Sequence, residues 1–217
     1  MGPDALLVVH PGALGDLVVA FDSLLRLRRR FPGGIDGVCQ GHLGRLAAGL
    51  GIFRRAVAME AAVFAGLYTD ASGGVDTALV DFFRPYKAVL LFSNSTALAQ
   101  GVRRVFRKPL HRIPPRPPRH RRIHVHDHLM DQLAAEGLLR RSDTAALFPP
   151  GFPSLKTGAD GGTRGAVVFI HPGSGSPRKN WPLERFAALA RRLLGAGMRP
   201  EFVLGPAEGR LRATLLE

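Results

Sequence analysis

The stretch ALLVVHPGALGD, residues 5–16, decides the fold class. Residues 5–9 form an apolar run typical of a buried strand, and a glycine-containing turn from His10 to Asp16 follows it. Apolar residues then recur with one-face helical spacing from Leu17 to Leu25. An arginine-rich end and the stop Phe31-Pro32-Gly33-Gly34 close this helix. With a further strand expected over residues 35–39, the pattern predicts a βαβ unit.

The second half of the chain repeats this scheme. Residues 166–170 read as a buried strand, and residues 171–176 form a glycine-rich turn. A helix is expected from Pro182 to a cap at Gly197, followed by a strand over residues 200–204. Both strands lead into His-Pro-Gly. The sequence therefore predicts an α/β fold with two Rossmann-like domains in tandem.

The middle of the chain adds further α/β alternation. Strands are expected over residues 78–82 and 87–92, with a helix cap at Ser93–Ser95. Residues 103–122 hold nine Lys or Arg and five Pro, which excludes a long helix or a central strand. Residues 149–165, rich in Pro, Gly and Ser, read as a linker.

These features divide the chain into an N-terminal domain over residues 1–148, the linker over 149–165, and the start of a C-terminal domain over 166–217. Two parallel strands do not make a stable sheet, so we expect a truncated second domain, with a partial helix over 210–217 and about 100 residues to follow.

Composition narrows the possible partners and the cellular compartment of the protein. The formal net charge of +13 indicates an anionic partner, although an arginine-favouring genome explains it equally well. The single Cys39 excludes an internal disulfide framework. Because neither a signal peptide nor an apolar run of about 18 residues is found, we expect a cytoplasmic protein, with the inner membrane surface as a candidate contact.

Three acidic or basic positions could carry chemistry. Asp16 follows the first strand, where a carboxylate can deprotonate a hydroxyl or simply cap a helix. The turn over residues 173–179 could hold a phosphate, with Lys179 adding a charge. Arg178 stands where the dinucleotide fingerprint has its third glycine. Glu208 follows the next strand, where it could hold a ribose or begin a helix.

Two other basic features are weaker signals. His124, His126 and His128 alternate as metal ligands on a strand would, but the stretch reads as the start of a helix to Leu138, on which they cannot converge. The chain also has no Asp-x-Asp motif for a divalent ion on a diphosphate. The basic stretch over residues 103–122 could hold an anionic acceptor or be a solvated connector.

In order and spacing, these blocks resemble glycosyltransferase family nine, the ADP-heptose:lipopolysaccharide heptosyltransferases. The resemblance rests on GALGD at residues 12–16, on HPGSG at 171–175 with KNWP at 179–182, on GPAE at 205–208, and on the stretch 124–137. It implies a GT-B fold with the active site between the two domains, and inverting, metal-independent transfer without a cofactor.

The resemblance also implies roles for individual residues. Asp16 matches the catalytic base. On the donor side, Ser174, Gly175 and Ser176 lie in the diphosphate loop, Lys179 matches the lysine that neutralises the leaving phosphates, and Glu208 matches the acid that contacts the ribose. Expected acceptor contacts are Gly12, Ala13, Leu14, Gly15, Arg112 and Arg116. The default donor is ADP-heptose, and the default acceptor is a lipopolysaccharide core or a related anionic glycan, with no nucleic acid expected.

Two departures from the family pattern stand out. The family has a basic residue where His10 precedes the first turn, and a further donor motif that this chain does not contain. Two alternatives therefore stay open. The first is another nucleotide-dependent Rossmann enzyme such as an oxidoreductase, which the incomplete fingerprint disfavours. The second is a non-enzymatic basic module that binds anionic lipid or nucleic acid.

Overall fold

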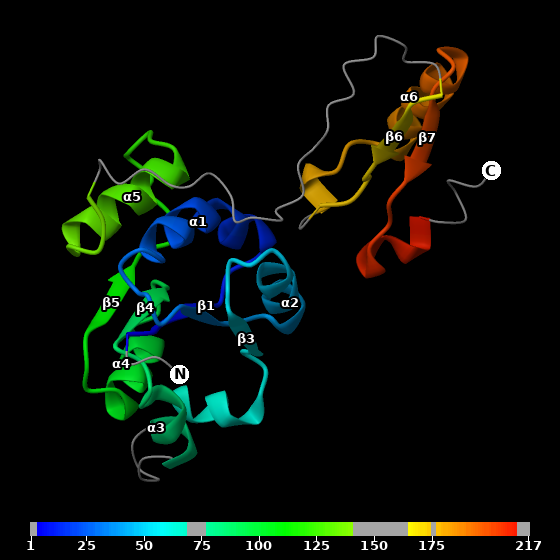
Figure 1. The fold of residues 1–217 in the computed structure, drawn as a ribbon. Coiled ribbons are helices and arrows are strands. Elements are labelled where there is room, and N and C mark those ends of the chain that lie inside the picture. The colour runs from blue at the N-terminus through cyan, green and yellow to red at the C-terminus, as the bar shows by residue number, and fades with distance from the viewer. Residues whose placement is uncertain (1–3, 69–76, 141–164, 175–176, 212–217) are drawn as a thin grey trace. The chain divides into compact units, whose positions relative to one another are not determined.

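The computed structural model describes residues 4–68, 77–140, 165–174 and 177–211 (Figure 1). The chain divides into two compact units, unit 1 over residues 1–154 and unit 2 over residues 155–217. The expected linker over 149–165 lies outside the described residues except for Gly165.

Unit 1 is built on a parallel sheet of five strands. These are β1 (Leu6–His10), β2 (Ile35–Cys39), β3 (Arg55–Ala58), β4 (Ala88–Phe92) and β5 (Leu110–Ile113). Their order is β3-β2-β1-β4-β5. The chain moves outward from β1 to β3 and then crosses to β4 on the other side of β1. The strand order therefore reverses between β1 and β4, which is where open α/β sheets bind ligands, at the carboxyl ends of the strands.

Helices cover both faces of this sheet (Figure 1). On one face lie α1 (Leu14–Leu27), α2 (Gly41–Gly49) and α5 (Val125–Ala135), and on the other lie η1 (Ala62–Leu67), α3 (Thr77–Phe83) and α4 (Thr96–Val105). Successive β1 residues alternate between the two cores, so Leu6 and Val8 pack under α1, while Leu7 and Val9 pack against α4 and its neighbours. Such two-sided burial explains the uninterrupted apolar run of β1.

The structure corrects one expected strand in unit 1. Residues 78–82 belong to the helix α3, in which Leu79 and Phe83 are buried one turn apart. A five-residue stretch with four apolar residues does not distinguish a strand from one face of a short helix, so the prediction was wrong. In the proline-rich stretch, the expectation of no central strand is confirmed, because β5 is a four-residue strand at the edge of the sheet.

Unit 2 pairs β6 (Val167–Ile170) with β7 (Arg199–Phe202) in parallel and carries α6 (Leu183–Gly195) with the 3-10 turns η3 (Pro177–Lys179) and η4 (Pro206–Leu211). The predicted cap at Gly197 is confirmed by its φ of 75°. Of the partial helix expected over 210–217, the first two residues close η4 and the others lie outside the described residues.

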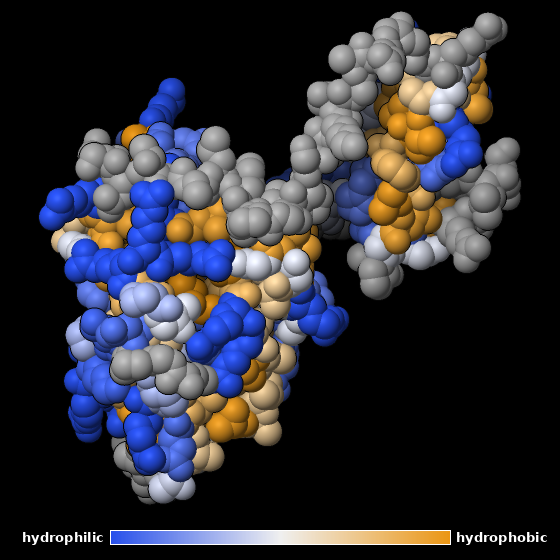
Figure 2. Space-filling view, viewed as in Figure 1, coloured by the Kyte–Doolittle hydropathy of each residue, from blue (hydrophilic) through white to orange (hydrophobic). Residues whose placement is uncertain are grey.

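The strand expected over residues 166–170 is present as β6, but the expectation that it is buried was wrong. Val167 and Phe169 are 42% and 69% exposed, whereas Ile170 is buried. Alternate residues of a strand point to opposite faces of the sheet, and among the described residues of unit 2 a helix covers only one of those faces. Figure 2 shows the resulting apolar surface on this unit in orange.

Candidate functional site

The site in unit 1 begins where β1 gives way to α1. The strand ends at His10, Pro11 to Ala13 form the turn, and Asp16 lies in the first turn of α1. Ala13 makes no side-chain cap bond, so the first N–H groups of the helix lie near a carboxylate rather than a hydroxyl cap. Asp16 thus lies at the carboxyl edge of the sheet, beside the reversal between β1 and β4.

Asp16 is paired with a residue 100 positions away. Nη2 of Arg116 lies 3.1 Å from one carboxylate oxygen of Asp16 and 3.2 Å from the other. The Asp16 side chain is 23% exposed and that of Arg116 is 70% exposed. The structure therefore brings together the predicted base and one of the two arginines predicted to bind the acceptor.

His10 lies beneath this pair. Its ring is buried and packs at a tilt against Phe92, the last residue of β4, with centroids 5.4 Å apart. A Cβ added to Gly12 would lie 2.8 Å from His10 Cε1 and 3.4 Å from Asp16 Oδ2, so only glycine allows the turn to pass between them. Burial lowers the pKa of His10, although main-chain hydrogen bonds and the Asp16 charge oppose that shift. The lowered pKa favours the neutral imidazole at physiological pH.

Two further strand ends meet this edge. Gln40, directly after β2, donates from Nε2 to the Gly12 carbonyl at 3.5 Å. Arg112 of β5 donates from Nε to the Ser93 carbonyl at 3.0 Å and from Nη2 to the Asn94 carbonyl, directly after β4. Arg112 thus fixes the turn after β4. The sequence reading did not assign Gln40 to the site, although the rule that ligands lie at strand ends could have found it.

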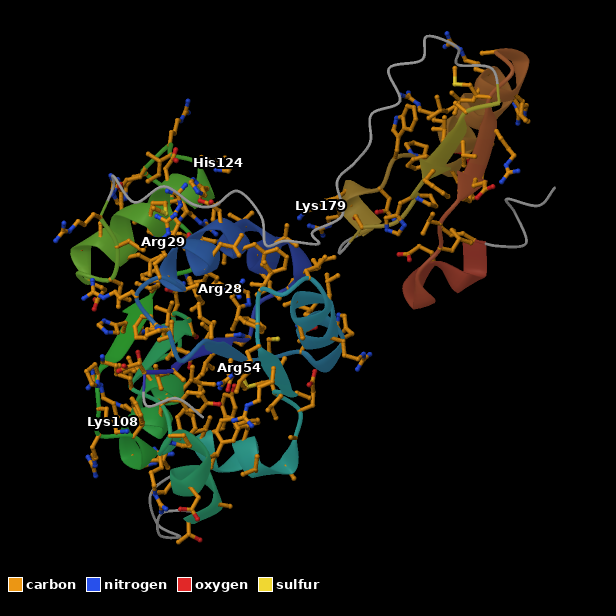
Figure 3. All side chains as sticks on the ribbon, viewed as in Figure 1. Arg28, Arg29, Arg54, Lys108, His124 and Lys179 are labelled. Carbon is orange, nitrogen blue, oxygen red and sulfur yellow. The ribbon has the colours of Figure 1, made fainter. Side chains whose placement is uncertain are left out.

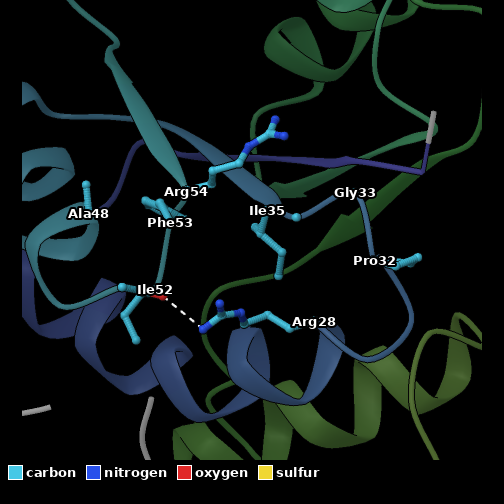
Figure 4. A pocket seen from close by; sticks show the side chains of 10 residues that line it. Arg28, Pro32, Gly33, Ile35, Ala48, Ile52, Phe53 and Arg54 are labelled. Carbon is cyan, nitrogen blue, oxygen red and sulfur yellow. Dashed lines mark hydrogen bonds between the residues drawn. The ribbon is translucent and has the colours of Figure 1, made fainter. Parts of the chain in front are cut away.

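A cavity of about 600 Å³ lies elsewhere in unit 1 (Figure 4). Its lining includes Arg28, which donates to the Gly51 carbonyl at 3.0 Å, and Arg54. Gly34 and Ile35 place it at the amino end of β2, on the edge of the sheet opposite to Asp16. Arg28 bonds the main chain just after α2, and Arg54 bonds the buried Asp36 of the core. The cavity is therefore not part of the candidate site.

In unit 2, Glu208 lies against the glycine turn at the carboxyl ends of the strands. A Cβ on Gly173 would lie 2.2 Å from Glu208 Oε1, so the carboxylate lies directly against this glycine. Oε2 accepts a hydrogen bond of 3.0 Å from the Gly205 N–H, just after β7. The residues following both strands of unit 2 therefore converge on one carboxylate, as expected for a group that contacts a ligand at the strand ends.

The other donor residues lie nearby along the chain. Ser174 donates to Asn180 Oδ1 at 2.6 Å, which ties the two ends of the loop together. Lys179 is exposed at the end of η3 (Figure 3). Trp181 packs edge-on against Phe186 at 5.2 Å and supports the start of α6. Gly175 and Ser176, also predicted to bind the donor, lie outside the described residues.

The histidine series does not form a metal site. His124 is the N-cap of α5, as the helical reading predicted, and His126 bonds Asp22 through Nε2 at 2.8 Å. Among the described residues, no group of three or more His, Cys, Asp or Glu is placed to hold a metal ion. In the same part of the chain, no helix has the length and apolarity to cross a membrane.

A scan against protein-family models and a search of curated proteins both found no match to this chain. Solved structures do match. The family 9 glycosyltransferase of Veillonella parvula aligns with a TM-score of 0.66 at 15% identity, over 99% of this chain and 67% of its own. The E. coli ADP-heptose lipopolysaccharide heptosyltransferase II aligns with a TM-score of 0.66 at 17% identity, over 98% and 68%.

The E. coli heptosyltransferase WaaC, solved with ADP-2-deoxy-2-fluoro heptose, aligns with a TM-score of 0.61 at 17% identity, over 98% of this chain and 73% of its own. These alignments include both units. The chain therefore has the α/β fold of the GT-B heptosyltransferases, as the sequence resemblance implied. It spans about two thirds to three quarters of the length of those chains.

Proposed function

We propose that this chain is a glycosyltransferase that moves a sugar from a nucleotide-diphosphate donor to a glycan acceptor, with inversion and without a metal. The observation that carries the proposal is Asp16, placed in the first turn of α1 at the strand reversal of a fold shared with heptosyltransferases. By analogy with those structures, the default donor is ADP-heptose. The default acceptor is a lipopolysaccharide core or a related anionic glycan, at the cytoplasmic surface of the inner membrane.

In the proposed reaction, Asp16 accepts the proton of an acceptor hydroxyl through one of its carboxylate oxygens. The hydroxyl oxygen attacks the anomeric carbon, and the bond from that carbon to the diphosphate breaks. The bonding electrons leave with the nucleoside diphosphate, whose negative charge Lys179 would offset. Attack from the face opposite to the leaving group inverts the anomeric centre.

The remaining residues would bind the two substrates. Glu208 and the turn from Gly173 to Ser176 would hold the donor ribose and diphosphate on unit 2. On unit 1, Gly12 to Gly15, Arg112 and Arg116 would contact the acceptor. Arg112 would also hold the turn after β4, because its Nε and Nη2 bond main-chain carbonyls there.

The first test is a thermal-shift panel with ADP, ADP-heptose, UDP, GDP and NAD. A ligand at 100 times its dissociation constant stabilises a protein by about 2.7 kcal/mol. We expect selective stabilisation by ADP or ADP-heptose, which Lys179→Ala should reduce. Preference for NAD would favour an oxidoreductase. Steeply salt-dependent binding of anionic vesicles or nucleic acid without any nucleotide effect would favour the basic binding module.

The second test is transfer itself. Asp16→Asn should lower kcat by about 100-fold to 10,000-fold, the range that a general base supplies, while leaving donor affinity unchanged. Asp81→Asn removes the same charge from an exposed position of α3 and should leave the rate unaltered. Transfer that survives in Asp16→Asn would show that Asp16 is not the base.

A further inference from the structure

The ion pair between Asp16 and Arg116 has a consequence for the proposed base. A single guanidinium nitrogen lies within 3.2 Å of both carboxylate oxygens. A base must itself come within about 2.6–3.2 Å of the hydroxyl that it deprotonates. Arg116 therefore bonds both of the oxygens to which an acceptor hydroxyl would have to bond, so the guanidinium and the hydroxyl compete for the base.

The main chain that carries Arg116 is held in place. Prolines flank the arginine on both sides, at 114, 115, 117 and 118, and proline fixes φ near −65°. The Pro114 carbonyl accepts a hydrogen bond of 3.0 Å from Nε2 of the buried His128 on α5. Two residues before Pro114, Arg112 is bonded to the turn after β4. The ion pair can therefore break by rotation of the Arg116 side chain, which is 70% exposed, without movement of the loop.

When the Arg116 guanidinium leaves Asp16, another anion has to replace the carboxylate as its partner. An exposed ion pair is weak because water and salt screen it, so a second anion nearby can exchange with the first. His10 offers no replacement cation, because its ring is buried and neutral. The natural source of the competing anion is the acceptor, since it arrives together with the hydroxyl.

We propose that Arg116 is a specificity-determining residue, which uncovers Asp16 when the acceptor presents a carboxylate or phosphate beside its reacting hydroxyl. This inference rests on the proposed transferase function. It adds that a neutral acceptor leaves the base covered, and that Asp16 and the acceptor anion compete for one guanidinium.

The competition can be measured without transfer. In 15N NMR spectra, the Nε–H signal of Arg116, assigned by its loss in Arg116→Lys, is followed during titration with glucuronate, glucose 6-phosphate or glucose at constant ionic strength. We expect one or both charged sugars to shift this signal, and glucose to leave it unchanged. Comparison of the two charged probes separates carboxylate from phosphate recognition. In Asp16→Asn the same anions should bind Arg116 more tightly, because their competitor is gone.

The transfer assay gives the second readout. Wild-type protein should prefer a charged acceptor over its matched neutral form by about tenfold or more in kcat/KM, the factor that one charge-assisted hydrogen bond supplies. Arg116→Gln should remove this preference and raise the rate with the neutral acceptor. Arg119→Gln, an equal loss of charge three residues away on the same exposed stretch, should keep the preference.

The two proposals fail differently. Absence of transfer to any acceptor, with an Arg116 signal that still responds to charged sugars, would overturn the transferase and leave the anion exchange standing. An Arg116 signal that ignores charged sugars, or anion affinity that is unchanged in Asp16→Asn, would overturn the exchange whatever the transfer assay shows. A charge preference that persists in Arg116→Gln would do the same.

Discussion

Replacement of Asp36 by alanine should destabilise unit 1 by about 3 kcal/mol. The buried Asp36 of β2 accepts hydrogen bonds from Arg54 Nε and Nη2 at 2.9 Å each, from Arg55 Nε at 2.7 Å and from Tyr86 Oη at 2.9 Å. Breaking a buried ion pair from one side costs about 3–5 kcal/mol. Arg54 and Arg55 are 38% and 47% exposed, so water reaches them and the lower end of that range applies.

Thermal and urea denaturation, followed by far-UV circular dichroism, would measure the change. For a chain of this size, 1 kcal/mol corresponds to about 2–4 °C, so Tm should fall by about 6–12 °C. The chain has one tryptophan, Trp181, which lies in unit 2 and reports that unit separately by fluorescence. Asp81→Ala, at an exposed position, is the control. A loss under about 1 kcal/mol in Asp36→Ala would refute the assignment of Asp36 as the hub of this network.

The pH dependence gives an independent check on Asp36. Burial alone would raise the pKa of its carboxyl group, but hydrogen bonds from Arg54, Arg55 and Tyr86 outweigh burial and lower it. A lowered pKa in the folded state stabilises the protein above the unfolded value of about 3.9 and ceases to do so as the pH falls through the folded value. The stability gap between wild type and Asp36→Ala should therefore be constant near neutrality and close only in acid.

Three further changes test packing and charge. Gly101→Ala should cost about 1–3 kcal/mol or more, because its Cβ would lie 1.9 Å from a main-chain oxygen of η1 that cannot move aside. Gly173→Ala should displace the Glu208 carboxylate and so reduce the thermal shift with ADP, with little change in stability. The Asp22 carboxylate raises the pKa of His126 by hydrogen bonding, so this pair should stabilise the protein below pH about 6.5 and lose its effect as the pH rises through the folded pKa, a slope that His126→Gln should abolish.

The glycine predictions have controls in the same chain. At Gly49 and Gly195 an added Cβ would meet no atom within 4 Å, and both residues end helices. Alanine there should leave stability and the ADP shift within about 0.5 kcal/mol of wild type. Equal losses at all four glycines would point to chain flexibility rather than to the close contacts named here. For the histidine pair, a pH slope that survives in His126→Gln would assign the titration to another group.

The parts of the fold that could be predicted were those with local causes. The stretch from residue 5 to residue 27 combines a two-sided buried strand with a turn and an amphipathic helix, and the structure has all three in place. Asp16 could be found because the carboxyl end of a parallel strand is a fixed location for ligands. The caps at Ser95 and Gly197 followed from side-chain and backbone chemistry within a few residues.

What could not be predicted depends on distant parts of the chain. The sequence offered Arg116 as an acceptor contact, but its pairing with Asp16 needs the sheet order that places β5 and its following loop at the same edge. The helix α3 was mistaken for a strand because its apolar residues suit either element, and only packing against η1 and α4 decides between them. The exposed face of β6 likewise depends on what covers it, which no local pattern records.

The repeated His-Pro-Gly has a physical explanation in the two glycines. In unit 1 a Cβ on Gly12 would meet both His10 and Asp16, and in unit 2 a Cβ on Gly173 would meet Glu208. Each glycine thus leaves room for an acid at the carboxyl edge of a parallel sheet. The two acids differ in origin, because Asp16 comes from the first turn of the following helix, whereas Glu208 comes from beyond the next strand. Asp16 pairs with the Arg116 side chain and lies in the first turn of a 14-residue helix, whereas Glu208 accepts a main-chain N–H and lies against the glycine turn, a position suited to holding a ligand.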